Sequence, residues 1–189
     1  MKKVAFIVLG ILLLAGGACM LLRGNAPTKA PANSAAATQT TSSAAAVGPD
    51  ASQLVIGRPG APITIIEYGD YKCPKCNEFH EQAGKDIRRE WVDTGKAKII
   101  FRPYPLFGED SGLALYASFC AAEQGKFTAY HDKMFSYMWS NFLSKGDTDA
   151  TVRTLFSPTK LAQLAGEVGL DEATFRTCAG GRTHADAYN

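Results

Sequence analysis

Two cysteines separated by two residues, Cys73 and Cys76, are the side chains of this sequence best suited to chemistry. In thiol–disulfide exchange, a thiolate attacks one sulfur of a disulfide and forms a mixed disulfide. A second cysteine at this spacing can then attack the mixed disulfide and release the partner. The spacing therefore predicts a redox pair that alternates between a dithiol and a disulfide.

The flanking sequence predicts the elements that position this pair. The apolar, β-branched stretch Ile63–Tyr68 favours a buried central strand, and Pro74 to about Asp93 favours a helix. The cysteines then lie at a helix start, where unpaired N–H groups and partial positive charge favour a thiolate. This placement predicts that Cys73 is the nucleophile and Cys76 the resolving thiol.

The same spacing also forms half of many zinc sites, which need four ligands. The chain has no second C-x-x-C, and its histidines, His80, His131 and His184, are isolated from one another. A purely structural disulfide is the other alternative, but closing so short a loop removes little chain entropy. The redox interpretation is therefore favoured, with no metal and no cofactor.

The segment Glu67–Phe79 resembles the DsbA-like branch of the thioredoxin superfamily. The matching features are an acid six residues before the first cysteine, a proline directly after it and an aromatic residue three positions after the second. The stretch Cys120–Phe135 is similar to the helical insertion of that branch. The resemblance covers residues 53–189 and implies an α/β, thioredoxin-like fold with a helical subdomain inserted at about 109–180.

Three further residues are candidates for tuning the redox pair. The resemblance implies that Glu67 is a buried acid that relays protons to or from Cys76, although pairing with Lys98 would also explain a charge in an apolar strand. Pro74 is expected to rigidify the turn. Lys75 would place a cation near the thiolate, the alternative being a solvated surface lysine.

Histidine and tyrosine side chains near the pair are expected to have structural roles for the most part. His80 lies four residues after Cys76, and a surface or rim histidine is favoured over a tuning role. His131 is expected to pack between helices. Tyr68 and Tyr71 are expected to pack around the site, with Tyr71 a candidate for a peptide-contacting surface.

The N-terminal part of the chain differs in composition from the rest. Within residues 1–23, two lysines precede 19 uncharged residues, enough to span a bilayer. An uncleaved membrane anchor is favoured, a cleaved signal peptide comes second and lipidation at Cys19 third. Each of these places the rest of the chain outside the cytoplasm. Residues 24–52, rich in Ala, Ser, Thr and Pro, are expected to form a flexible linker.

The two remaining cysteines, Cys120 and Cys178, fall in predicted helices of a chain expected to reach an oxidising compartment. Two free thiols beside a disulfide-exchanging site would be hazardous, so a structural disulfide between them is predicted. It would hold the helical insertion to the helix that begins at Asp171. Two buried, reduced cysteines are the alternative.

The remaining elements follow from periodicity and capping signals. Short strands are expected at 53–56 and 96–104, and helices at 110–124, 126–138, 158–168 and 171–179. The strand–helix–strand unit should be parallel. The thioredoxin-like fold also needs a final β-hairpin and a closing helix, which the sequence after Pro158 does not predict, so the chain is expected to be C-terminally incomplete. We therefore expect at most three strands, a partly uncovered Glu67 and a chain that is poorly stable and weakly active.

These features together predict an extracytoplasmic, membrane-tethered thiol:disulfide oxidoreductase acting on cysteine-containing polypeptides. The resemblance implies reoxidation by a quinone-linked, DsbB-like membrane partner. A reductase or isomerase kept reduced by a membrane donor, and a non-catalytic thioredoxin-like binding module, remain as alternatives. Residues 53–189 hold 16 basic and 17 acidic side chains, with no phosphate-binding glycine loop, so nucleic acid is not expected as a partner.

Overall fold

The structure, a computed structural model, describes residues 54–181 and His184. The expected membrane segment 1–23, with Cys19, and the expected linker 24–52 lie outside the described residues. No helix among the described residues is both long enough and apolar enough to cross a membrane.

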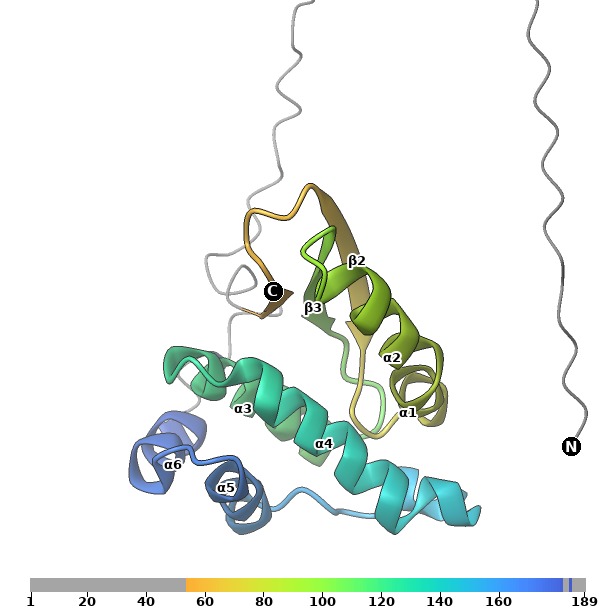
Figure 1. Cartoon of the computed structure of the whole chain (residues 1–189). Coiled ribbons are helices and arrows are strands. Elements are labelled where there is room, and N and C mark those ends of the chain that lie inside the picture. The colour runs from red at the N-terminus through yellow and green to blue at the C-terminus, as the bar shows by residue number, and fades with distance from the viewer. Residues whose placement is uncertain (1–53, 182–183, 185–189) are drawn as a thin grey trace, which may run out of the picture. The chain divides into compact units, whose positions relative to one another are not determined.

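The described strands form one mixed sheet in the order β1-β3-β2 (Figure 1). The strands are β1 (Val55–Gly57), β2 (Ile63–Gly69) and β3 (Ala97–Pro103). Strand β2 is parallel to β3, as predicted, and β1 is antiparallel to it. The expectation that Ile63–Tyr68 is the central strand is wrong for the described sheet: β1 and β2 pair with opposite edges of β3, so β3 is central.

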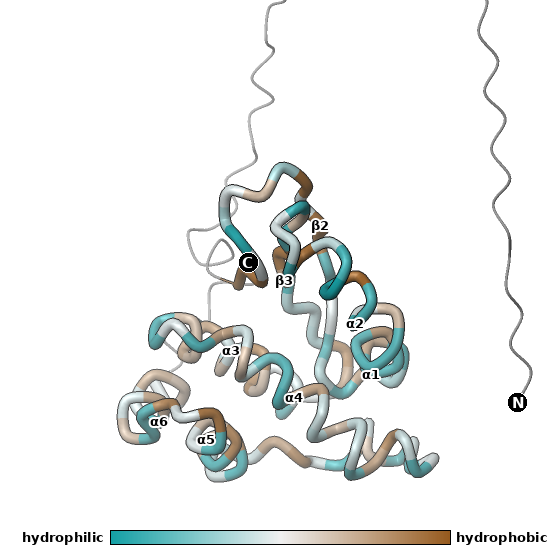
Figure 2. The backbone as a smooth tube through the Cα atoms, in the orientation of Figure 1, coloured by the Kyte–Doolittle hydropathy of each residue, from teal (hydrophilic) through white to brown (hydrophobic). Residues whose placement is uncertain are grey.

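The two faces of the sheet have different surroundings. Ala97, Ile99 and Phe101 alternate along β3 and are buried, which defines the face that packs on the helices. Glu67 pairs with Phe101 in the parallel register and therefore belongs to the same face. On the opposite face of β2, Tyr68 is 67% exposed. Figure 2 shows hydrophobic residues along both β2 and β3.

The single helix expected over residues 74–93 is interrupted. It consists of α1 (Pro74–Glu81), α2 (Ala83–Ile87) and a π-helical turn, Arg88–Val92. The break lies at Gln82, whose φ of −116° and ψ of −98° are not helical. A Cβ at Gly84 would lie 2.9 Å from the Phe79 carbonyl oxygen, so glycine permits the close approach that the break requires.

The chain after β3 is helical, as the sequence predicts, with ends within three residues of the expected ones. The helices are α3 (Glu109–Glu123), α4 (Phe127–Asn141), α5 (Pro158–Glu167) and α6 (Glu172–Gly181). Two short 3-10 turns, Leu143–Lys145 and Thr148–Thr151, separate α4 from α5.

Side-chain caps mark the starts of both α5 and α6. The Ser157 hydroxyl accepts the Lys160 amide at 3.2 Å, and the Asp171 carboxylate accepts the Thr174 amide at 2.7 Å. Both bonds satisfy amides that have no partner within their own helix. The local sequence therefore defines where these two helices begin.

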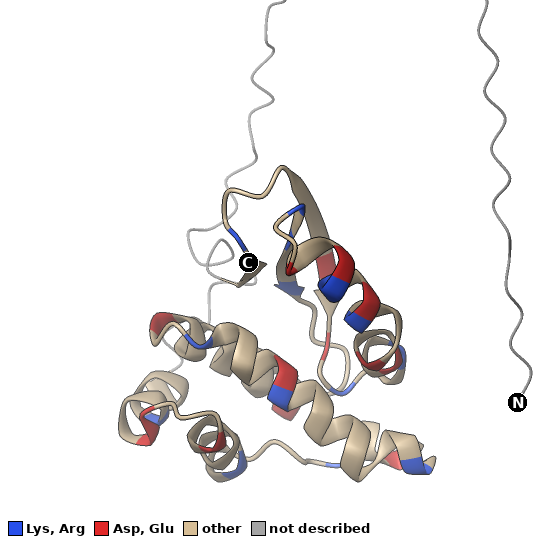
Figure 3. Cartoon of the chain, viewed as in Figure 1, with Lys and Arg blue, Asp and Glu red and all other residues tan. Residues whose placement is uncertain are grey.

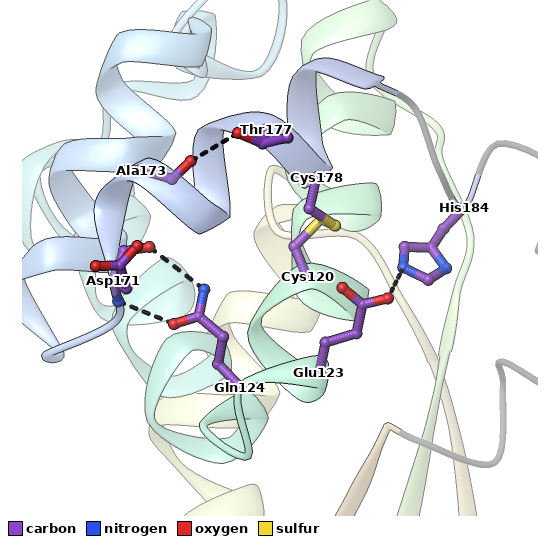
Figure 4. The surroundings of a disulfide bond; sticks show 8 residues. All are labelled: Cys120, Glu123, Gln124, Asp171, Ala173, Thr177, Cys178 and His184. Atoms are coloured by element: carbon purple, nitrogen blue, oxygen red, sulfur yellow. Dashed lines mark hydrogen bonds and ion pairs between the residues drawn. A yellow bond between two sulfur atoms is a disulfide. The ribbon is translucent and has the colours of Figure 1, made fainter.

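A disulfide joins Cys120 of α3 to Cys178 of α6, the pair predicted from the sequence (Figure 4). Their Cα atoms are 5.8 Å apart, within the range that a disulfide can bridge. Beside it, Gln124 and Asp171 exchange two hydrogen bonds, and His184 contacts Glu123. These contacts tie the last described helix to α3.

One hydrophobic core connects the sheet with the helices. Helix α4 packs against α1, α3 and β1, which places its inner side chains directly behind the cysteine-bearing helix. The largest fully buried members of the core include Tyr71, Phe101, Tyr130 and Phe135. Charged residues lie mainly outside this core, and Figure 3 shows acidic and basic residues interleaved on α1 and α2.

Candidate redox site

Cys73 is the N-cap of α1. Its backbone is extended, with φ −69° and ψ 120°, and Pro74 occupies the first helical position, where its missing N–H costs nothing. The Cys73 Sγ accepts the backbone N–H of Cys76 at 3.4 Å. The sulfur therefore lies where the helix presents its unpaired donors and partial positive charge.

Cys76 lies in the first turn of α1 and has a different environment. Burial, followed by a hydrogen bond with the Cys73 thiol, raises the pKa of Cys76 to about 12. Both cysteines are free and partly exposed. Cys76 is therefore protonated at neutral pH, and its environment differs from that of Cys73, whose sulfur lies at the helix N-cap.

The turn before the helix is held by the side chain of Asn77, which the sequence reasoning missed. Its amide group donates to the carbonyls of Tyr71 and Cys73, at 2.7 and 2.9 Å. The Cys73 amide in turn donates to the Asp70 carbonyl at 3.1 Å. An asparagine one residue after a C-x-x-C motif carries no sequence signal for this role, because its partners are backbone atoms.

Glu67 lies on the helix-facing side of the sheet and lines a hollow of about 230 Å³. The other lining residues are Tyr68, Lys75, Cys76 and Phe79. Burial raises the pKa of the Glu67 carboxyl, although the nearby charges of His80 and Arg88 oppose the shift. The hollow brings an acid of raised pKa to the same space as the Cys76 thiol.

The suggested pairing of Glu67 with Lys98 is wrong. Lys98 pairs with Thr64 in the sheet register, so it belongs to the opposite face from Glu67. Its ammonium donates to the Pro59 carbonyl instead.

Lys75 extends into solvent, with 86% of its side chain exposed, and its ammonium lies 2.6 Å from the Glu78 carboxylate. The hydrogen bond with Glu78 raises the pKa of Lys75. The Lys75 ammonium is therefore paired with its neighbour on the same helix, and its role in tuning the Cys73 sulfur stays a prediction.

His80 is buried, so the interpretation of a surface or rim histidine is wrong. Its Nε2 lies 3.2 Å from the Asp132 carboxylate of α4, and Arg88 also donates to that carboxylate. The hydrogen bond from His80 and the charge of Arg88 outweigh burial and lower the pKa of Asp132. This cluster joins the cysteine-bearing helix to α4, a contact between residues 52 positions apart that periodicity could not reveal.

His131 packs inside the core, as expected, against Phe101, Phe135 and Tyr71. Burial, followed by the charge of His80, lowers the pKa of His131 to about 3. Tyr71 is fully buried and its hydroxyl lies 2.6 Å from the Ser118 hydroxyl. The suggestion that Tyr71 lines a peptide-contacting surface is therefore wrong.

One group of side chains near the site has potential metal ligands. His80, His131 and Asp132 each place one ligand atom within 4.8 Å of the others. The Asp132 carboxylate already accepts bonds from His80 and from the cation of Arg88. A second cation at this position would meet the repulsion of Arg88, so the arrangement favours an ion-pair network.

Comparisons with known proteins agree with this geometry. The family model described as "Thioredoxin" matches residues 50–185. A curated relative, "Disulfide bond formation protein D" of Bacillus subtilis, is 35% identical over 85 residues, which cover 44% of this chain and 38% of the relative. The chain thus matches less than half the length of that relative.

Two solved structures share the fold at 26% sequence identity. The oxidised form of BdbD from Bacillus subtilis gives a TM-score of 0.62, over 72% of this chain and 70% of that one. The alpha-DsbA1 protein of Wolbachia pipientis gives 0.55, over 71% and 62%. The helices after β3 are therefore part of a known architecture.

Proposed function

Because the chain belongs to the thioredoxin family, we propose that it is a protein thiol:disulfide oxidoreductase with Cys73 and Cys76 as its redox pair. The observation that carries this proposal is the asymmetry of the two sulfurs. Cys73 accepts a helix amide at the N-cap, whereas Cys76 is held protonated by burial. In this proposal, the Cys73 sulfur forms the mixed disulfide with the substrate, and the Cys76 sulfur resolves it.

In the oxidising direction, a substrate thiolate attacks the Cys73 sulfur of the Cys73–Cys76 disulfide. The S–S bond breaks, its electron pair remains on the Cys76 sulfur, and that sulfur takes up a proton. A second substrate thiolate then attacks the substrate sulfur of the mixed disulfide. The substrate leaves oxidised by two electrons, and the protein retains both thiols.

The proton that Cys76 gains or loses needs a local carrier. Glu67 shares the hollow with Cys76, and its raised pKa brings its carboxyl closer to neutral pH than that of an exposed glutamate. We assign Glu67 the role of exchanging this proton, directly or through one water.

The proposed substrates are cysteine-containing polypeptides outside the cytoplasm. The name of the Bacillus subtilis relative, which refers to disulfide bond formation, supports this class. The disulfide between Cys120 and Cys178 supports an oxidising compartment. The proposed tether is the apolar segment within residues 1–23, and a membrane redox partner of the DsbB-like or reductase kind would renew the pair.

The test uses the full chain purified in detergent. The oxidised protein is mixed with a reduced two-cysteine peptide, and peptide oxidation and the reduction potential of the pair are measured. We expect stoichiometric oxidation that Cys73→Ser abolishes. A potential more reducing than that of the peptide would assign the reverse direction. Exchange no faster than in the Cys73→Ser protein, or zinc bound to the fresh protein, would refute the proposal.

A further inference from the structure

Lys72, the residue directly before Cys73, is buried, with only 1% of its side chain exposed. Lysine is rarely buried unless its charge is paired, because removing an ammonium from water is costly. The proposed chemistry does not use this side chain. Its burial next to the reactive sulfur therefore calls for a separate explanation.

The Lys72 ammonium has three N–H donors and three acceptors around it. It donates to the Asp110 carboxylate at 2.7 Å, to the Arg153 carbonyl at 2.9 Å and to the Phe107 carbonyl at 3.0 Å. These acceptors come from the segment before α3, the first turn of α3 and the segment before α5. One side chain thus joins three parts of the helical region to the cysteine turn.

The carboxylate of Asp110, the ion-pair partner of Lys72, is also held by several hydrogen bonds. Its second oxygen accepts the amides of Leu155 and Phe156, at 2.8 and 3.2 Å. Burial alone would raise the pKa of Asp110, but the bonds from Lys72 and from these amides outweigh it and lower the pKa. The pair is therefore a charged one.

Asp70 completes the arrangement on the other side of Lys72. One carboxylate oxygen accepts the Lys72 amide at 2.8 Å, and the other accepts the Leu106 amide at 2.7 Å and the Ser111 hydroxyl. The backbone and the side chain of Lys72 are therefore both anchored.

We propose that Lys72 is a positioning residue for thiol–disulfide exchange: its buried ion pair with Asp110 holds Cys73 at the N-cap of α1. The proposal rests on the proposed function of the redox pair. Adjacent Cα atoms are only about 3.8 Å apart, so a shift of Lys72 moves Cys73 with it. The contact between the Cys73 sulfur and the Cys76 amide, 3.4 Å long, depends on that position.

The test compares Lys72→Met and Asp110→Asn in the full chain, each of which breaks the same pair. The measurements are the alkylation rate of Cys73 by iodoacetamide at pH 7, the reduction potential and the thermal midpoint. We expect both variants to slow alkylation about fivefold, the factor that corresponds to the loss of one helix cap. The reduction potential of the Cys73–Cys76 pair should become more reducing by about 20 mV. A fivefold change in the equilibrium of a two-electron couple corresponds to this shift.

Lys72→Arg tests whether charge alone is sufficient. It keeps the cation, but a planar guanidinium cannot direct its donors at the three acceptors of the ammonium. We expect it to resemble Lys72→Met rather than the parent. It also serves as the milder variant if the methionine protein does not fold.

Two control variants separate positioning from general destabilisation. Lys133→Met removes an ion pair with Glu167 on the helical region, and Phe175→Leu loosens the buried core at α6. Neither should change alkylation or potential. The inference is overturned if Lys72→Met lowers the thermal midpoint but leaves both site measurements equal to those of Phe175→Leu.

The pair of single variants also tests a purely electrostatic role. Removing the cation and removing the anion would then move the alkylation rate in opposite directions, and this result would overturn positioning. If the parent protein alkylates at Cys73 but exchanges no disulfide, the proposed function fails while the positioning measurement still stands.

Discussion

The backbone N–H of Cys76 is directed at the sulfur of Cys73, 3.4 Å away, so Cys76 caps the Cys73 side chain through its own main chain. The same two residues also share a hydrogen bond between their thiols, which contributes to the high pKa of Cys76. One turn of helix therefore places two identical side chains in different environments.

The first prediction concerns this difference. Cys73→Ser should abolish exchange, because no other free thiol in the described chain occupies a helix cap. Cys76→Ser should instead accumulate mixed disulfides with substrate, because the resolving sulfur is absent. Non-reducing electrophoresis after incubation with a two-cysteine substrate measures both. Accumulation in the Cys73→Ser protein would reverse the assignment of the two sulfurs.

The second prediction concerns Lys75. Lys75→Gln should change the reduction potential less than Lys72→Met does, because the Lys75 ammonium is exposed and paired with Glu78. Glu78→Gln is the matched variant, since it frees the ammonium to act on the sulfur. We expect this variant to make the pair more oxidising and to increase alkylation of Cys73. A large shift in the potential of Lys75→Gln would instead support the tuning role expected from the sequence.

The elements of the fold were accessible from the sequence because each has a local signal. Alternating apolar residues define β3, and a proline or a capping side chain marks the starts of α1 and α5. The break at Gln82 has no such signal. It depends on the fit of Gly84 against the Phe79 carbonyl, which only the folded backbone reveals.

The residues of the candidate site also fall into two groups, those with a local sequence signal and those without one. Cys73 and Cys76 are found by spacing alone, since the motif and the helix start are contiguous. Lys72 and Asp110 are 38 residues apart in the sequence, and each is a residue type that usually lies on the surface. Their pairing depends on the packing of α3 beside the cysteine turn, so sequence reasoning about local patterns could not find it.

The third prediction tests proton transfer by Glu67. In the reducing direction, Cys76 releases the substrate by attacking the Cys73 sulfur of the mixed disulfide. Glu67→Gln should slow that release by about tenfold or more, because the carboxyl that accepts the Cys76 proton is lost. Alkylation of Cys73 should be unchanged. Single-turnover kinetics between pH 5 and 8 measure the release step, and Lys98→Gln, on the opposite face of the sheet, is the control. Equal release rates in the Glu67→Gln variant and the parent protein would exclude the relay.

The same variant should alter stability in a defined direction. Burial raises the pKa of Glu67 in the folded state above 4.5, its value in the unfolded chain. The folded protein therefore favours the neutral carboxyl, and the contribution of this preference to the unfolding free energy is complete below pH 4.5. It is lost as pH rises through the folded pKa. Glu67→Gln should therefore be more stable relative to the parent at pH 8 than at pH 4. Urea unfolding at the two pH values measures this difference.

The fourth prediction concerns the disulfide between Cys120 and Cys178. It links residues 58 positions apart, and cross-linking a loop of this size is expected to stabilise the fold by about 4 kcal/mol. Replacing both cysteines by alanine should lower the unfolding free energy by roughly that amount, measured in urea without reductant after the Cys73 and Cys76 thiols have been alkylated. A double-variant loss below about 1 kcal/mol would show that α3 and α6 hold together without it.

The last prediction concerns His131, whose pKa burial lowers to about 3 against 6.5 for the ordinary side chain. The folded state excludes the protonated form, so stability from this group is complete above pH 6.5 and is lost progressively as pH falls toward 3. Between pH 7 and pH 5 the loss from this histidine alone should be about 2 kcal/mol. His131→Phe keeps an aromatic ring among Phe101, Phe135 and Tyr71 but cannot take up a proton. Urea unfolding measures the unfolding free energy of both proteins at pH 7 and pH 5. We expect this free energy to fall by about 2 kcal/mol less in the variant than in the parent. Equal decreases in the two proteins would contradict a neutral, buried His131.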